Sequence, residues 1–235
     1  FLQGILPDNG LYCIFAANTS TDRRNQQFYT SVDDLVEAAT SLDSKGYDVY
    51  FALATFNKDK SRKVDNVKHL KSFFLDLDCG PSKEFTSQGN ALEHLMGFCK
   101  RIALPKPILV NSGRGIHVYW PFSEAVPFDD WLPVANRLKQ LCIQNKFMAD
   151  PAVTADAARV LCIPKTHNYK PDTPVEVTCI STSIPVIDFD KFSNTLGNKP
   201  IPVPAKRIEG ANAVMQAALG NQEYKFKSIL EKSVA

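Results

Sequence analysis

The spacing of apolar residues along the chain predicts strands that alternate with amphipathic helices. Gly10–Phe15 and Tyr47–Phe56 are apolar enough to be buried strands, and residues 18–27 between them have the composition of a polar loop. Ser31 is a suitable N-cap for a helix that ends near Gly46. The apolar positions that recur at helical spacing in it are Leu35, Val36, Ala39 and Leu42. This part of the chain therefore predicts strand, helix and strand packed in layers.

The same alternation continues further along the chain. A second amphipathic helix begins near Ser87, Ile108–Val110 is a short apolar strand, and a third helix runs from Asp129 to Lys146. Val175–Cys179 is a further strand. The residues expected to face inward from the two helices are Leu92, Leu95, Cys99 and Ile102, followed by Val134, Leu138 and Leu141. Strands and helices in this order predict an α+β fold of mixed α/β layers.

Two carboxylates stand one residue apart at the end of an apolar run that begins at Phe73. They are Asp76 and Asp78, with Leu77 between them. Alternate side chains of a strand share a face, so both acids are expected to point the same way. Carboxylates this close repel each other, and one takes up a proton unless a cation lies between them. A divalent metal ion is the obvious cation, and the alternative is a strand end where both acids face water.

A glycine-rich hairpin is predicted over Asn111–Trp120. Gly113 and Gly115 allow a ligand to come close to the backbone, and their N–H groups can cup an anion. The polar side chains that this hairpin presents are Ser112, Arg114 and His117. The segment therefore predicts a phosphate or nucleotide clamp. The alternative is a glycine-rich turn with a buried histidine that donates to a carbonyl group.

Charged residues gather in two more segments. Asp150 follows the apolar residues 147–149. Residues 153–170, taken alone, have the pattern of a strand that carries polar side chains. Residues 57–71 are basic and precede the paired acids, which predicts a phosphate-contacting loop or, as the alternative, a solvated charged loop. The basic residues of this segment are Lys58, Lys60, Arg62, Lys63, Lys68 and Lys71.

Composition limits the possible functions without choosing among them. The 235 residues are 44% hydrophobic, which is enough for one large domain or two small ones. A net charge of +2 does not identify a nucleic-acid binder, so any basic surface has to arise from local clustering. The 6 cysteines form no Cys-x-x-Cys pair and no zinc-type cluster, which predicts free thiols in a reducing compartment. No apolar run is long enough to span a bilayer, so a cytoplasmic location is expected.

Three of these stretches together resemble the signatures of the archaeo-eukaryotic primase superfamily, and most closely its primase-polymerases of phages and other mobile elements. The matching residues are Phe74-Leu75-Asp76-Leu77-Asp78, then Asn111-Ser112-Gly113-Arg114-Gly115-Ile116-His117-Val118-Tyr119-Trp120, then Asp150 with Asp156-x-x-Arg159-Val160-Leu161 and Asn168-x-Lys170. The paired acids are a weak signal alone, whereas the hairpin is a specific one. Their order and spacing argue against coincidence over residues 1–190.

The resemblance implies a catalytic core of two α/β modules, one with an RRM-like sheet, and an active site in the cleft between them. It implies that Asp76 and Asp78 bind two Mg²⁺ or Mn²⁺ ions with a third acid, which we place at Asp150, with Asp156 as its rival. Such ions would activate the 3′-hydroxyl of a growing strand and stabilise the departing pyrophosphate. The residues expected to contact the nucleotide are Ser112, Arg114, Gly115, His117, Arg159, Lys165, Asn168 and Lys170.

The third signature departs from the superfamily pattern at two positions. Many relatives carry Leu-Arg-x-Pro-Gly-Thr where this chain has Leu161-Cys162-Ile163-Pro164-Lys165-Thr166. An arginine is thus replaced by Cys162 and a glycine by Lys165. The difference bears on the nucleotide and template contacts of this region, and so on the choice between ribo- and deoxyribonucleotides and on activity.

The function implied by the resemblance is that of a DNA-directed primase-polymerase, which extends a primer from NTPs or dNTPs and can also include de novo primer synthesis. The implied partners are a single-stranded DNA template with its primer and a helicase, either as a domain of a longer chain or as a separate protein. No membrane partner is expected, and a phage-encoded protein would act in the cytoplasm of the host cell. Residues 191–235 are expected to form a proline-containing linker, at 198–204, and a helical segment, at 211–233, that leads to or docks from a further domain.

Two other classes of function stay open at this point. A module of the same fold could bind nucleic acid or nucleotides without synthesis. The retained acids argue against it, because a polyanion binder has no use for clustered negative charge without a metal ion. A metal-dependent nuclease or nicking initiator would be expected to show a His-hydrophobe-His pair or a nucleophilic tyrosine beside it, and the sequence shows neither.

Overall fold

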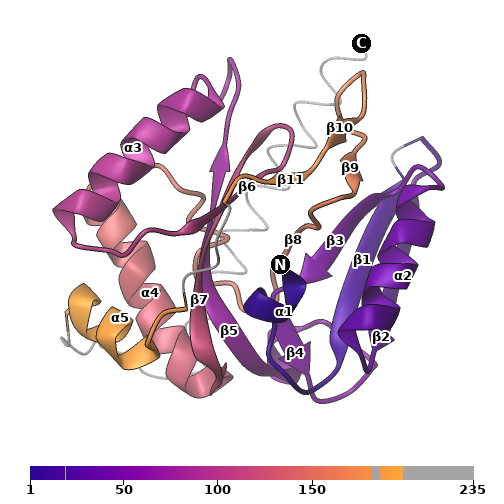
Figure 1. The fold of residues 1–235 in the computed structure, drawn as a ribbon, viewed down its shortest axis with the longest axis horizontal. Helices are drawn as coiled ribbons and strands as arrows, with labels where there is room; N and C mark the ends of the chain where they lie inside the picture. Colours follow the sequence, from indigo (N-terminus) through magenta and orange to yellow (C-terminus); the bar gives the residue numbers. More distant parts are fainter. Residues whose placement is uncertain (19, 182–185, 198–235) are drawn as a thin grey trace, which may run out of the picture. The chain divides into compact units, whose positions relative to one another are not determined.

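The computed structural model describes residues 1–18, 20–181 and 186–197 of the chain. These residues form two main β-sheets with helices packed against them, which confirms the predicted mixed α/β class (Figure 1). The linker expected at 198–204 and the helix expected at 211–233 lie outside the described residues.

The larger sheet has five strands in the order β11-β6-β7-β5-β4. Its strands are β4 (Ala54–Phe56), β5 (Val67–Asp78), β6 (Ile108–Asn111), β7 (Gly115–Pro127) and β11 (Thr178–Cys179). The two long central strands, β5 and β7, pair antiparallel from Asp78↔Gly115 to His69↔Pro127, with a shift of register between Leu70 and Ser72. The apolar run before the paired acids is thus a strand, as predicted, and it lies in the interior of the sheet.

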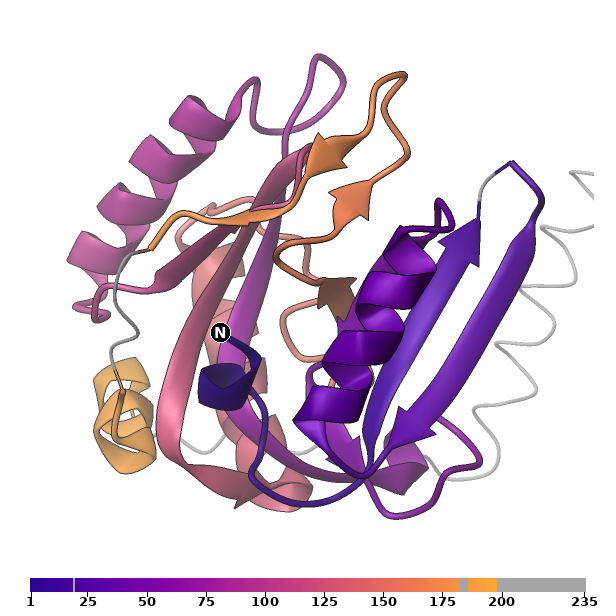
Figure 2. The same cartoon turned by 45° about the vertical axis from the view of Figure 1, so that its right-hand side comes forward.

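The smaller sheet has four strands in the order β2-β1-β3-β8, all antiparallel. They are β1 (Tyr12–Asn18), β2 (Arg23–Tyr29), β3 (Asp48–Ala52) and β8 (Val160–Cys162). The helix α2 (Val32–Asp43) lies over one face of this sheet (Figure 2). The Ser31 hydroxyl caps it by accepting the backbone N–H of Asp34, as the sequence predicts. Val36 was expected to face inward, but it is 45% exposed.

The prediction of a polar loop over residues 18–27 is wrong from residue 23 onward, because β2 begins there. β2 is an edge strand whose residues are mostly exposed, so its sequence lacks the apolar alternation that marks a half-buried strand. The single strand expected over Tyr47–Phe56 is divided into β3 and β4, which belong to different sheets. Residues 153–170 hold only short strands and turns rather than one strand.

Further helices, turns and short strands lie outside the two main sheets. They are α1 (Leu2–Ile5), the 3-10 turn η1 (Val64–Asn66), α3 (Gln88–Arg101), α4 (Phe128–Gln144), β9 (His167–Asn168), β10 (Val175–Glu176) and α5 (Phe189–Leu196). Leu95, Cys99 and Leu138 are buried as predicted. The other four inward-facing predictions, Leu92, Ile102, Val134 and Leu141, are only partly buried and pack at the edge of the core.

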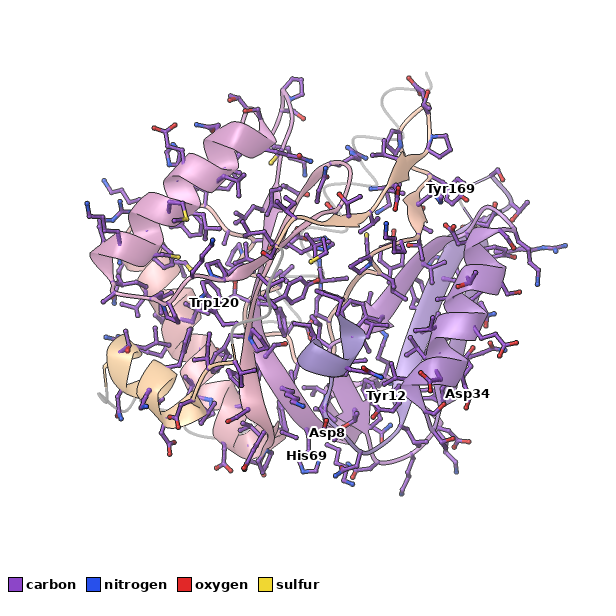
Figure 3. The ribbon with its side chains drawn as sticks, in the orientation of Figure 1. Asp8, Tyr12, Asp34, His69, Trp120 and Tyr169 are labelled. Carbon is purple, nitrogen blue, oxygen red and sulfur yellow. The ribbon has the colours of Figure 1, made fainter. Side chains whose placement is uncertain are left out.

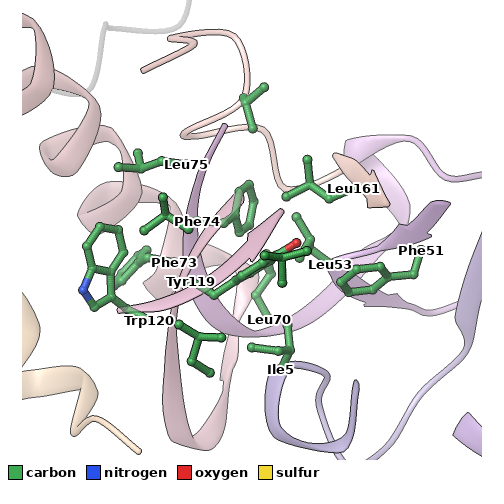
Figure 4. Close-up of a cluster of buried hydrophobic side chains, with 14 of the residues drawn as sticks. Ile5, Phe51, Leu53, Leu70, Phe73, Phe74, Leu75, Tyr119, Trp120 and Leu161 are labelled. Atoms are coloured by element: carbon green, nitrogen blue, oxygen red, sulfur yellow. The ribbon is translucent and has the colours of Figure 1, made fainter. Parts of the chain in front are cut away.

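Aromatic rings fill the space between the larger sheet and the helices α4 and α5. The ring of Phe73 lies 5.8 Å from that of Trp131 and 4.9 Å from that of Phe192, both stacked. The Trp131 indole N–H donates to the carbonyl of Ser72 at 3.0 Å, so the buried polar atom is satisfied. Figure 4 shows Phe73 and Trp120 within this buried cluster. Both α1 and α4 contact β5, and the three apolar residues of β5 just before the acids, Phe73, Phe74 and Leu75, are fully buried.

The basic segment at 57–71 is only partly a loop. β5 begins at Val67, so Lys68 and Lys71 belong to a strand. The Lys71 side chain is 11% exposed, and its ammonium bonds the Asp8 carboxylate at 2.9 Å. Asp8 lies at the end of β5 where His69 is also found (Figure 3). The expectation of phosphate contacts or of a solvated loop is therefore corrected for Lys71, which is buried in an ion pair.

Substitution of Gly115 tests the pairing of β5 and β7. A Cβ at this position would lie 2.4 Å from the backbone oxygen of Leu77, which cannot move without breaking the ladder. We expect Gly115→Ala to lower the free energy of unfolding by about 3 kcal/mol, measured by urea denaturation. Gly97→Ala in α3 is the control, since it meets only the flexible end of Arg101 and should stabilise by about 0.5–1 kcal/mol. Equal effects of the two substitutions would contradict this prediction.

Candidate functional site

A pocket of about 290 Å³ lies between the two sheets, with residues of both in its walls. Most of the residues predicted from the sequence line it: Asp76, Asp78, Ser112, Arg114, His117, Arg159, Asn168 and Lys170. Gly115, Asp150, Asp156 and Lys165 do not line it. The predicted position of the site, in a cleft between two sheets, thus coincides with a real concavity.

The two acids of β5 share the pocket, while Leu77 between them is fully buried on the other face. Asp76 stands directly opposite His117 in the β5–β7 register, and its Oδ1 lies 3.8 Å from the histidine Nε2. The Asp78 carboxylate accepts a hydrogen bond of 2.7 Å from the Lys83 ammonium. The strand pairing therefore places an acid and an imidazole side by side in one wall.

The Asp76 carboxyl is the most perturbed acid of the pocket. Burial, and after it the charge of Asp78, raise the pKa of Asp76 to about 7, although Arg159 acts in the opposite direction. Asp150 raises the same pKa further. The repulsion inferred from the spacing of the two acids is therefore present, and the pocket favours a proton or another cation at Asp76.

The paired acids fit a hard divalent cation, because carboxylate oxygens are the ligands that Mg²⁺ and Mn²⁺ prefer and because Asp76 lacks sufficient compensating charge. Among the described residues, however, no three His, Cys, Asp or Glu side chains are gathered as a metal-binding group. The third acid is therefore the part of the expected ligand set that this structure does not assemble, and its assignment stays a prediction.

The two candidates for the third acid differ in how they are held. The backbone N–H of Asp150 donates to the carbonyl of Asp76 at 3.0 Å, so Asp150 is tied to β5. Its carboxylate accepts the N–H of Ala152 at 2.8 Å and lies 3.9 Å from the Arg159 guanidinium. The carboxylate of Asp156 instead accepts the backbone N–H of Ala158, within its own turn. Asp150 is thus the candidate nearer to the paired acids, although the residues before it form a loop rather than a strand.

His117 is 4% exposed, and burial lowers its pKa to about 3, so its imidazole is neutral. The Tyr119 hydroxyl lies 3.4 Å from its Nδ1. Burial raises the pKa of Tyr119 well above its usual value, so this hydroxyl stays protonated and can donate to Nδ1. Such a bond leaves Nε2, which faces Asp76 and the pocket, as the N–H donor of the ring.

The glycines of the hairpin have packing roles. The N–H of Gly113 donates to the Asn111 side chain at 2.8 Å, so the expected cupping of an anion lacks this donor. The φ angle of Gly113 is +86°, in the left-handed region that favours glycine. Gly115 allows the close approach of Leu77 already described. Of the hairpin, it is the side chains of Ser112, Arg114 and His117 that reach the pocket.

The opposite wall is fixed by a strap formed by residues 159–170. The Asn168 side chain donates to the carbonyl of Ser112 at 2.7 Å and so joins the strap to the hairpin. Asp43 accepts the backbone N–H of His167 at 2.7 Å, and Asp48 accepts that of Tyr169 at 2.7 Å. These bonds hold the strap against α2 and β3, and thereby position its cations at the pocket.

Lys165 and Cys162, the two positions that depart from the superfamily pattern, behave differently. The Lys165 side chain is 85% exposed, and its ammonium lies 3.1 Å from Glu176, outside the pocket. Cys162 does line the pocket, where burial raises its pKa to about 12. The pocket therefore has a neutral thiol where many superfamily members have an arginine.

Three residues of the pocket were missed in the sequence. They are Tyr50, Cys79 and Lys83. Gly80-Pro81 was a usable signal for Lys83, because a turn there returns the chain toward Asp78. Tyr50 has no such signal, since it lies in the middle of a strand and reaches the site only through the packing of the sheets.

One curated protein resembles part of this chain in sequence. No protein-family model matches the chain. A replication protein of Clostridium perfringens is 30% identical over 137 residues, which are 58% of this chain and 33% of that protein. The chain thus spans about a third of the length of this curated relative.

Solved structures match over most of the chain. The AEP domain of the cyanophage S-2L primase-polymerase has a TM-score of 0.58 at 16% identity, covering 80% of this chain and 89% of that one. The catalytic domain of primase RepB′ in complex with initiator DNA has a TM-score of 0.55 at 14% identity, covering 83% and 89%. This chain has the primase-polymerase fold. The resemblance predicted from three motifs is confirmed at the level of that fold.

The polymerase domain of Mycobacterium tuberculosis ligase D, in complex with DNA, also shares the primase-polymerase fold, with a TM-score of 0.52 at 12% identity over 79% of this chain and 80% of that one. The solved structures therefore agree on the fold of this chain. Among the described residues, no helix combines the length and the apolar character needed to cross a membrane.

Replacing Asp76 should change the pH dependence of stability in metal-free buffer. Its pKa is about 7 in the folded chain and near 3.8 in the unfolded one, so the wild type loses stability as the pH rises between these values. We expect Asp76→Asn to be more stable than the wild type by about 2–4 kcal/mol at pH 8, with the difference vanishing below pH 4. Thermal unfolding across this pH range measures it, and a difference independent of pH would contradict the prediction.

Proposed function

We propose that this chain is the catalytic domain of a DNA-directed primase-polymerase. It would transfer nucleotides from NTPs or dNTPs to the 3′-hydroxyl of a primer on single-stranded DNA, in the replication of a phage or mobile element. The observation that carries this proposal is the division of charge in one pocket, with Asp76 and Asp78 in one wall and Arg114, Arg159 and Lys170 around them. The helicase partner and the start of primers de novo belong to the same proposal.

The paired acids and the cations divide the chemistry between them. Asp76 and Asp78 would hold two Mg²⁺ or Mn²⁺ ions with Asp150. A divalent ion bound there supplies activation of the attacking hydroxyl and neutralises charge on the departing pyrophosphate. The cations of the opposite wall, Arg159 and Lys170, would bind the triphosphate, and a guanidinium can do so with two parallel hydrogen bonds.

His117 contributes as a neutral donor. Its Nε2–H faces the pocket and can donate to a phosphate oxygen, while Tyr119 on the far side of the ring holds the tautomer. Because burial lowers its pKa to about 3, the imidazole keeps one N–H donor and one acceptor nitrogen at neutral pH. The Ser112 hydroxyl is a second neutral donor in the same wall.

A nucleic-acid or nucleotide-binding module without synthesis is the second candidate. Two observations favour it: the Lys83 ammonium already bonds Asp78, and the described residues assemble no group of three metal ligands. Such a module would bind DNA or nucleotides in the same pocket and form no product.

Primer extension distinguishes the two candidates. We expect the full chain to extend a primer on a DNA template, or to synthesise one de novo, with Mg²⁺ or Mn²⁺. We expect Asp76→Ala to lower the rate by at least about 100-fold, since it removes one of the paired ligands. Asp190→Ala on α5 is the control, because this exposed acid lies outside the pocket. Absence of wild-type product with every metal and nucleotide would favour the binding module.

A stripe of alternating cations and aromatic rings leads from the pocket across the smaller sheet. The Lys170 ammonium lies 5.3 Å from the Tyr50 ring centroid, and this ring lies 6.1 Å from that of Phe15. The Arg62 guanidinium follows, 5.7 Å from the Phe15 ring. Rings on which bases stack, beside cations that contact phosphates, are the usual surface for single-stranded nucleic acid. This stripe, Lys170-Tyr50-Phe15-Arg62, is the template path that we propose.

Replacing one ring of the stripe should weaken DNA binding. We expect Phe15→Leu to raise the Kd for a single-stranded oligonucleotide by about 5- to 10-fold, because leucine keeps the apolar bulk but not the stacking ring. Fluorescence anisotropy at fixed salt measures this. Tyr29→Leu is the matched control, since Tyr29 pairs with Tyr12 in the β1–β2 register, and Tyr12 is on the opposite face of β1 from Phe15. If both substitutions weaken binding equally, the template path lies elsewhere.

A further inference from the structure

A second depression, of roughly 640 Å³, adjoins the paired acids on the side of α4. It shares Asp78 and Lys83 with the pocket between the sheets, and Asp150 lies in its wall. The loop that follows α4 contributes most of its apolar surface, including Met148. Asp78 therefore stands between two concavities, and the function proposed above places its substrate in only one of them. We call the second one the Met148 pocket.

The surface of the Met148 pocket is apolar and unusually exposed. Ile143 is 54% exposed and Met148 is 48% exposed, although both are large apolar side chains. Beneath them, Phe147 is buried and stacks on Phe98 with ring centroids 4.5 Å apart, so the floor is rigid. An apolar surface on a rigid floor beside reactive groups suits a flat apolar ligand such as a nucleobase.

The charges around the Met148 pocket limit the size of that ligand. Lys83 and Lys146 line it and can contact a phosphate. Asp78, Glu84 and Asp150 also line it and repel a longer run of phosphates. One nucleotide at the end of a strand, with a single phosphodiester, fits this balance better than a continuous backbone does.

The geometry of phosphoryl transfer decides which nucleotide this is. The bond from O3′ to the α-phosphorus forms as the bond from that phosphorus to the pyrophosphate oxygen breaks, and the hydroxyl proton passes to water. The attacking and leaving oxygens lie in line on opposite sides of the phosphorus. If the cations of the pocket between the sheets hold the triphosphate, then the 3′-hydroxyl has to come from the other side of the acids, where the Met148 pocket lies.

We propose that the Met148 pocket binds the 3′-terminal nucleotide of the strand that is extended, with its base against Ile143 and Met148 and its phosphodiester beside Lys146. This inference rests on the proposed function, since it assigns a subsite to the same reaction. It predicts that changes in the Met148 pocket affect the primer and not the incoming nucleotide.

Substitution of two methionines, one inside and one outside the Met148 pocket, tests this proposal. Met148→Ala and Met96→Ala remove the same side chain from two positions, 48% and 52% exposed, and Met96 lies on α3 away from both concavities. We expect Met148→Ala to raise the KM for the primer by about tenfold and to change the KM for the nucleotide by less than about twofold. Met96→Ala should match the wild type. Ile143→Ala, at a second exposed position, should repeat the effect of Met148→Ala.

A binding measurement that needs no turnover accompanies the kinetics. A primer ending in 4-thiothymidine is irradiated with the full chain, and we expect the cross-link within residues 143–151. If the wild type extends primers but Met148→Ala behaves as Met96→Ala, or the cross-link falls elsewhere, the subsite is overturned and the proposed function stands. If the wild type makes no product under any condition, the proposed function is overturned and this inference with it.

Discussion

The antiparallel pairing of β5 with β7 is the constraint on which the rest of the site depends. Its register sets Asp76 opposite His117 and Asp78 opposite Gly115, so a shift of β5 by one residue would turn both acids to the other face of the sheet. The same ladder requires a residue without a side chain at 115, because the Leu77 carbonyl occupies that space. The chemistry of the pocket is thus fixed by main-chain hydrogen bonds in the most buried part of the fold.

The second constraint is electrostatic. A buried carboxyl beside another carboxylate is unfavourable in the folded chain, and the raised pKa of Asp76 reflects this. The fold retains the arrangement because the cations are on separate segments: Arg159 and Lys170 come from the strap that Asp43 and Asp48 hold in place. Charges of opposite sign therefore face each other across the pocket without neutralising each other fully. A ligand that brings metal ions to the acids and phosphates to the cations can compensate the charges of both walls.

The sequence predicted those parts of the site that come from single elements. Asp76 and Asp78 were predictable because strand alternation alone puts them on one face. Ser112, Arg114 and His117 were predictable because they lie beside two glycines in a short hairpin. Tyr50 and the edge strand β2 were not, since their positions result from how two sheets pack and carry no local pattern. Lys71 and Lys165 were misplaced for a related reason, because a basic residue does not reveal whether an acid such as Asp8 or Glu176 has engaged it.

The bond from Lys83 to Asp78 shows how the acids can be stable before a ligand arrives and still be available to it. The ammonium compensates the charge of Asp78, at 2.7 Å from its carboxylate. Both side chains are about half exposed, at 41% and 54%, so water competes for each of them and the pair contributes little to stability. Replacing this ammonium by a more highly charged ion would therefore cost little. Lys83 lies at the junction of the two concavities, where a released ammonium could contact a phosphate in either one.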